Sequence, residues 1–124
     1  MNISEFSQHT GISAHTIRYY EKAGIIRNIN RNASGHRNFT KDDLIWADFI
    51  HRLKETGMSL ANIKEYADMR EEGSITSESR MKLLQKHVEI LEDKIETHSL
   101  HLKKLHEKIK LYETQINGEK FNLT

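Results

Sequence analysis

Apolar residues recur every seven positions along the last third of the chain. A helix pattern of this length without proline or glycine predicts a coiled coil. One helix cannot bury its own apolar stripe, so we expect a dimerisation surface shared with a second copy of the chain. The first row holds Met81, Val88, Ile95, Leu102, Ile109 and Ile116, and the second row, three residues later, holds Leu84, Leu91, His98, Leu105 and Tyr112.

The repeat leaves two questions open, the orientation of the paired helices and the role of the histidines. Val or Ile in one row with Leu in the other is associated with parallel dimers. His98, the one polar member of its row, suits a core position that fixes register. Alternatively, His98 and His101, with His87 and His106 on the same helix, could bind zinc or nickel in a dimer. Spacing alone shows no converging imidazoles, so we predict no metal and no cofactor.

The first seventy residues predict four short helices. Each begins after a residue whose side chain can cap a helix, and each ends near a glycine. The first two helices, joined by a short glycine turn, predict a helix-turn-helix. Residues 25–39, between the second and third helices, predict a hairpin or loop that carries Arg31 and Arg37. The caps are Asn2, Ser13, Thr40 and Ser59, and the glycines are Gly11, Gly24, Gly57 and Gly73.

The charge is divided unevenly along the chain. Residues 1–41 hold six basic and two acidic side chains, a net charge of +4, whereas the remainder carries −3. A basic head on an acidic body predicts a polyanionic partner for the head. The chain has no cysteine, which excludes disulfides, thiol nucleophiles and zinc–thiolate sites. It shows no apolar stretch long enough for a membrane span and no signal peptide, so we expect a cytoplasmic protein without membrane contact.

Two motifs in the head resemble those of MerR-type transcription regulators. TIRYYEKAGII, at residues 16–26, is similar to the family's recognition helix, and RNASGHRNF, at residues 31–39, is similar to its wing. The similarity continues through residues 53–60 and the terminal helix. It implies a mainly α fold, with a winged helix-turn-helix head followed by a long C-terminal dimerisation helix in an antiparallel coiled coil. The implied domains are residues 1–73 for DNA binding, 78–117 for dimerisation and 118–124 as a short tail.

The resemblance also assigns residues to DNA. Arg18 and Tyr19 match the DNA-contacting pair of the recognition helix. The leading turn of that helix holds Ser13, His15 and Thr16, and the wing contributes Arg31, His36 and Arg37. His36 and Phe39 stand where the family pattern usually has Tyr. The imidazole of His36 can still donate to a phosphate, with a weak pH dependence, whereas Phe39 is expected to pack under the wing.

The resemblance implies a homodimer that binds a pseudo-palindromic operator in double-stranded promoter DNA. Such dimers distort the DNA so that RNA polymerase engages both promoter elements. Residues 49–58, FIHRLKETGM, are especially similar to an aldehyde- and thiol-stress subgroup, but Arg52 occupies the position of its reactive cysteine. Covalent thiol sensing is therefore excluded, and no effector is identified. Trp46 and Tyr66 could line a small apolar pocket, although core packing is the favoured interpretation.

Three other functions deserve comparison with a DNA-binding regulator. No phosphate-binding glycine loop, metalloprotease motif or nucleophile elbow is present, so we predict that the chain is not an enzyme. A coiled-coil module whose basic head binds an acidic protein would show no specific DNA footprint. A metal or small-molecule sensor would be distinguished by calorimetry. Neither of these two explains the joint spacing of the helix motif, the wing motif and the heptads.

Overall fold

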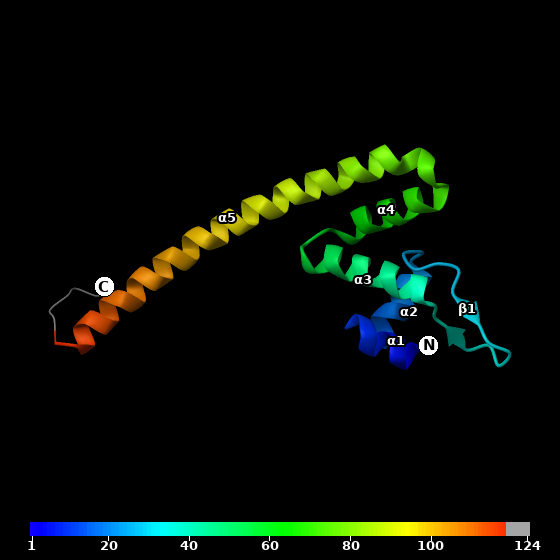
Figure 1. Cartoon of the computed structure of the whole chain (residues 1–124), viewed down its shortest axis with the longest axis horizontal. Coiled ribbons are helices and arrows are strands. Elements are labelled where there is room, and N and C mark those ends of the chain that lie inside the picture. Colours follow the sequence, from blue (N-terminus) through cyan, green and yellow to red (C-terminus); the bar gives the residue numbers. More distant parts are fainter. Residues whose placement is uncertain (119–124) are drawn as a thin grey trace. The chain divides into compact units, whose positions relative to one another are not determined.

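The computed structural model describes residues 1–118, which are mainly helical (Figure 1). The chain divides into two compact units, Met1–Gln85, which we call the head, and a second unit that begins at Lys86, which we call the rod. The boundary lies inside the last helix. The elements in order are α1 (Ile3–Thr10), α2 (Ala14–Lys22), β1 (Asn30–Arg31), β2 (Arg37–Asn38), α3 (Lys41–Glu55), α4 (Leu60–Glu72), the short 3-10 helix η1 (Ser74–Thr76) and α5 (Ser77–Ile116).

Side-chain caps set the starts of the first four helices, as the sequence predicted. Asn2 Oδ1 accepts from the Glu5 backbone N–H at 2.9 Å, and the Glu5 carboxylate accepts from the Asn2 backbone N–H at 3.3 Å. The same reciprocal pair at the start of α3 joins Thr40 and Asp43, at 3.1 and 2.9 Å. Such pairs satisfy N–H groups that have no partner within the helix. Single caps from Ser13 and Ser59 start α2 and α4.

The segment between α2 and α3 forms a short antiparallel hairpin. Asn30 pairs with Asn38 and Arg31 with Arg37. The connecting turn is closed by Asn32, whose Oδ1 accepts from the backbone N–H groups of Ser34 and His36 at 3.0 Å each. Gly35 follows with a φ of +79°, which a side chain would disfavour. Of the two expectations, a hairpin or a loop, the structure shows a hairpin, and its turn is held by a local asparagine.

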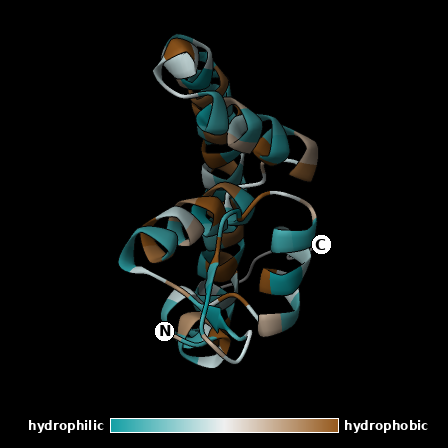
Figure 2. Ribbon diagram, turned by 90° about the vertical axis from the view of Figure 1, so that its right-hand side faces the viewer, coloured by the Kyte–Doolittle hydropathy of each residue, from teal (hydrophilic) through white to brown (hydrophobic). Residues whose placement is uncertain are grey.

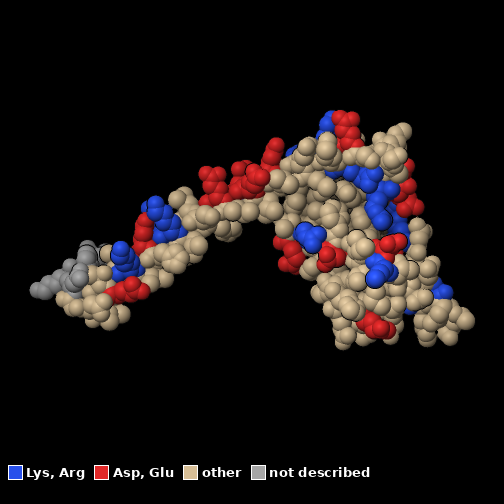
Figure 3. Space-filling model, viewed as in Figure 1, with Lys and Arg blue, Asp and Glu red and all other residues tan. Residues whose placement is uncertain are grey.

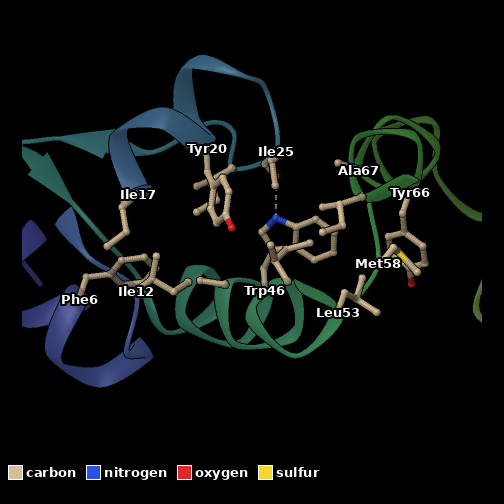
Figure 4. Close-up of a cluster of buried hydrophobic side chains, with 14 of the residues drawn as sticks. Phe6, Ile12, Ile17, Tyr20, Ile25, Trp46, Leu53, Met58, Tyr66 and Ala67 are labelled. Carbon is tan, nitrogen blue, oxygen red and sulfur yellow. Dashed lines mark hydrogen bonds between the residues drawn. The ribbon is translucent and has the colours of Figure 1, made fainter. Parts of the chain in front are cut away.

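One apolar core joins the helices of the head, and Figure 4 shows part of it. The side chains of Phe6, Ile17, Ile26, Ile50 and Ile63 are fully buried. Trp46 points from α3 toward the segment after α2, where its indole N–H donates to the Ile25 carbonyl at 2.9 Å. Burial of these side chains supplies most of the free energy that holds the head's helices together.

The α5 helix has a different character from the helices of the head. It runs for 40 residues and none of its residues is buried in the single chain. Its first turns form part of the head, where Leu83 and Leu84 pack against the core. Figure 3 shows charged side chains along one side of most of α5 and an uncharged surface along the other.

Hydrophobic and hydrophilic residues alternate along the helices, as Figure 2 shows. Among residues 1–118, no helix combines the length and the apolarity that crossing a membrane requires. The exposed apolar rows of α5 and its charged side (Figure 3) make this helix amphipathic, which is typical of a helix that packs against a partner along one face.

Candidate nucleic-acid interface

Helix α2 presents a polar face to solvent and an apolar face to the core. Ile17 and Tyr20 are buried, whereas His15, Arg18 and Tyr19 are exposed. Burial, and after it the neighbouring Tyr19, raises the pKa of the Tyr20 hydroxyl. Tyr20 is thus a neutral core residue at physiological pH. These three exposed side chains lie one to four residues apart on a short helix, so all of them could reach into one major groove of DNA.

The first turn of α2 is organised by its cap. Ser13 Oγ accepts from the Thr16 backbone N–H at 3.1 Å and also donates to Thr16 Oγ1 at 2.9 Å. Ser13 and Thr16 are therefore joined to each other, and the helix N-terminus that they form favours an anion. Arg18 makes no ion pair with any carboxylate of the described residues. Its guanidinium remains available to a phosphate or a guanine edge.

The wing is linked to α2 by Glu21. The Arg37 Nε–H donates to Glu21 Oε1 at 2.6 Å, and Arg31 Nη2 lies 3.8 Å from the same oxygen. Arg31 also donates to the Gly35 carbonyl at 3.0 Å across the turn. One carboxylate therefore holds both wing arginines beside α2. Glu21 could not be identified from the sequence, because its partners are 10 and 16 residues away and no local pattern joins them.

A second cluster links the segment after α2 to α4. Asp68 accepts from Lys64 at 2.6 Å and forms an ion pair with Arg27. The Lys64 hydrogen bond, followed by that of Arg27, lowers the pKa of the Asp68 carboxyl. The Arg27 Nε–H also donates to the Gly24 carbonyl at the end of α2. This cluster orients the chain that leaves α2, and it too was missed from the sequence.

The structure brings the predicted DNA residues of α2 and the wing onto neighbouring elements of one head. His36 is exposed at the hairpin turn, and Arg37 is half-buried against Glu21. Phe39, predicted to pack under the wing, is buried and stacks on Phe6 with ring centroids 4.1 Å apart. Trp46 and Tyr66 are core residues, as favoured, although both also line a hollow on the head's surface.

The predicted dimerisation residues lie on α5, and most are exposed in the single chain. Leu84 differs, since it packs partly against the core of its own head. Leu91 is half-buried. The remaining members of the two rows, all exposed, are Met81, Val88, Ile95, His98, Leu102, Leu105, Ile109, Tyr112 and Ile116.

Two predictions concern the histidines and the tail. The imidazole rings of His98 and His101 lie edge to face, 6.5 Å apart. Within the described part of the chain, no group of three or more His, Asp or Glu side chains is placed to hold a metal ion. Most of the predicted tail, residues 119–124, lies outside the described residues.

Comparison with known protein families agrees with the geometry of the head. Residues 1–70 match the family described as MerR HTH family regulatory protein, and residues 46–106 match the family described as MerR, DNA binding. An uncharacterised HTH-type transcriptional regulator of Haemophilus influenzae is 42% identical over 79 residues, which cover 64% of this chain and 58% of that protein. The regulator AdhR of Bacillus subtilis is 36% identical over 84 residues, 68% of this chain and 60% of AdhR. The chain thus matches about three fifths of the length of these two relatives.

Two solved structures resemble this one along most of their length. A MerR-family regulator from Listeria monocytogenes is 39% identical, with a TM-score of 0.86 over 94% of this chain and 88% of the other. HiNmlR, described as a MerR family regulator lacking the sensor domain and bound to promoter DNA, is 32% identical, with a TM-score of 0.86 over 94% of this chain and 93% of the other. The two relatives of this chain from Haemophilus influenzae and Bacillus subtilis are named as transcriptional regulators, not as enzymes. With its winged helix-turn-helix head and long terminal helix, the chain belongs to the MerR family of HTH transcription regulators.

Proposed function

We propose that the protein acts in the cytoplasm as a homodimer that binds a pseudo-palindromic operator in double-stranded promoter DNA. The outward face of α2 carries this proposal. It combines an unpaired Arg18, an exposed Tyr19 and a capped helix N-terminus in one short helix. A related structure, HiNmlR, is bound to promoter DNA. Arg18 and Tyr19 contact the groove and its backbone, with Ser13, His15 and Thr16 around the leading turn.

The wing supplies the second part of the interface. Arg31, His36 and Arg37 approach the phosphate backbone beside the groove that α2 enters. Glu21 already occupies the Arg37 Nε–H, so the two terminal nitrogens of that guanidinium remain for phosphate oxygens. Wing contacts of this kind fix the register of the head on the duplex and carry little sequence information.

Dimerisation supplies the spacing between two heads. The apolar rows of α5 are exposed in one chain, and pairing with the same rows of a second copy removes them from water. An antiparallel pair sends the two heads toward opposite ends of the coil. Heads separated in this way engage two half-sites and distort the promoter, which changes how RNA polymerase initiates.

A mobility-shift assay on the chain's own upstream region tests the assignment of α2. Arg18→Ala should weaken operator binding by about tenfold or more, since a bidentate guanidinium contact contributes roughly 1–3 kcal/mol. Lys104→Ala, which removes an exposed charge from α5, should leave the affinity unchanged. Equal affinity of Arg18→Ala and the parent would overturn the assignment. Equal binding of the parent to operator and random duplexes would instead favour a basic module for an acidic protein partner.

A further inference from the structure

The head contains a surface hollow that DNA binding and dimerisation leave without a role. Its volume is about 490 Å³, within the range of small-molecule sites. Residues of α3, α4 and the first turn of α5 line it, all within the head. None of the predicted DNA-binding or dimerisation residues contributes to the lining.

One side of the hollow is aromatic and apolar. The rings of Trp46, Phe49 and Tyr66 contact one another, with centroid separations of 5.4 to 6.0 Å. Phe49 is half-buried, and next to it Ile45 is 68% exposed. An exposed isoleucine beside a partly open aromatic ring leaves apolar surface in water, and covering it with a planar ring is favourable.

The other side of the hollow is cationic. The Arg70 guanidinium lies over the Trp46 ring, 4.1 Å from its centroid, which fixes the position of its planar fork. Arg80 is oriented by hydrogen bonds to Thr76 Oγ1 at 3.1 Å, the Gly73 carbonyl at 3.2 Å and Ser77 Oγ at 3.3 Å. Neither arginine has a carboxylate within ion-pair distance among residues 1–118.

The net charge of the side chains that line the hollow predicts the charge of its ligand. A third arginine, Arg52, lies 3.3 Å from Asp48, so that these two charges offset each other. Of the other charged residues in the lining, Arg70 and Arg80 are basic and Asp42 is acidic. The lining therefore carries a net charge of +1. A planar guanidinium matches a carboxylate with two parallel hydrogen bonds.

We propose that this hollow binds a small aromatic monocarboxylate. The ring of the ligand lies against Phe49 and Ile45, and its carboxylate accepts from the Arg70 guanidinium, with Arg80 beside it. The proposed contacts are an ion-paired hydrogen bond and ring packing, so binding is reversible and non-covalent. It does not depend on the proposed DNA binding, because no lining residue belongs to the proposed DNA interface of α2 and the wing.

The single tryptophan of the chain makes the site directly measurable. Trp46 fluorescence of the full-length protein is titrated with 2-naphthoate and with its neutral isostere 2-naphthamide, in the absence of DNA. We expect saturable quenching by naphthoate, with an affinity about tenfold tighter than that of the amide, because a charge-assisted pair is the stronger bond. Equal affinities, or no saturable binding of naphthoate, would overturn the proposal.

Variants separate this site from non-specific binding. Arg70→Gln should abolish the preference for the acid over the amide, and Phe49→Ala should weaken both probes. Lys54→Gln, which removes an exposed charge from another face of α3, should behave as the parent. An unchanged preference in Arg70→Gln would refute the carboxylate contact, and circular dichroism melts confirm that each variant folds.

A second copy of the chain is the competing occupant of the hollow. Naphthoate titrations of the parent and of the dimer-defective Leu102→Asp variant should therefore give the same affinity. Binding to Leu102→Asp alone would show that the hollow is covered in the dimer, and would overturn the proposal. If the parent protein failed to bind the operator, the proposed function would be refuted, and the fluorescence result would still stand.

Discussion

At the scale of single residues, Phe39 shows how one aromatic side chain supports the wing. It is 3% exposed, and its ring stacks on Phe6. The Phe39 backbone N–H donates to the Met1 carbonyl at 2.7 Å, so the segment after the wing is paired with the segment before α1. The position where the family pattern usually has Tyr is thus a packing site in this chain.

Phe39→Ala is therefore expected to destabilise the head by about 3–4 kcal/mol, the usual cost of removing a buried phenyl ring. Urea unfolding followed by circular dichroism measures the change. Tyr19→Ala, at an exposed ring on α2, is the matched control and should change the free energy of unfolding by less than about 0.5 kcal/mol. A Phe39→Ala cost below that of Tyr19→Ala would contradict the packing role.

At the scale of elements, the wing and α2 are joined by ion pairs. Glu21 on α2 binds Arg37 and lies near Arg31, so α2 and the hairpin share one carboxylate. By charge alone, an acidic side chain beside the proposed DNA interface is unfavourable. Its place between two arginines instead indicates that it positions the wing.

Glu21→Gln is expected to weaken operator binding several-fold, although it removes a negative charge from the interface. Without the Glu21 carboxylate the wing is less ordered in the free protein. Binding to DNA must then order it, and the entropy cost of that ordering lowers the affinity. Fluorescence anisotropy with a labelled operator measures the affinity. Glu5→Gln removes the same charge from α1 and should bind as well as the parent, or slightly tighter. Tighter binding by Glu21→Gln would show that the carboxylate acts only as a repelling charge.

The cluster between α4 and the segment after α2 predicts a pH dependence. Lys64 and Arg27 hold the pKa of Asp68 below its ordinary value. Its contribution to stability is therefore complete above the ordinary carboxyl pKa and is lost as the pH falls through the lowered folded-state value. Asp68→Asn should flatten the decline of the urea midpoint between about pH 5 and pH 2.

Asp93→Asn is the control for that measurement, because Asp93 lies exposed on α5 outside the cluster. The urea midpoint of Asp93→Asn should decline as the pH falls in the same way as that of the parent. A parallel decline for all three proteins would mean that the Asp68 cluster contributes nothing to acid sensitivity.

At the scale of the whole molecule, the proposed dimer depends on α5. A helix of 40 residues spans about 60 Å, and its exposed apolar rows need a partner. Leu102→Asp places a charge in the middle of the first row and should abolish the dimer in sedimentation equilibrium. Lys104→Asp, two residues away outside both rows, should remain dimeric. A dimeric Leu102→Asp protein would show that the apolar rows of α5 do not form the dimer interface.

The orientation of the two helices is testable because the chain has no cysteine of its own. In an antiparallel pair, a residue near the end of the coil lies far from its own copy, whereas in a parallel pair it lies beside it. Ile109→Cys should therefore fail to form a disulfide-linked dimer under mild oxidation. Rapid cross-linking through residue 109 would establish a parallel coil.

Local signals explain why so much of the fold was predictable from the sequence. The starts of α1 to α4 follow from Asn2, Ser13, Thr40 and Ser59, because a cap acts on N–H groups within three residues. The heptads of α5 are equally local, since periodicity places the apolar residues on one face of a helix. The exposed side chains of α2 follow from the same geometry.

The sequence by itself therefore determined the helices and the outward residues of α2, and it left open whether the segment between α2 and α3 is a hairpin or a loop. Only the tertiary structure decided which distant side chains meet: Glu21 with the wing arginines, Asp68 with Arg27, Leu84 with the core of its own head, and Arg70 over Trp46. Caps and periodicities act within a few residues, whereas the ion pairs among these contacts join residues 10 to 41 positions apart. Their formation depends on how the helices pack around the core, and no local pattern encodes that packing.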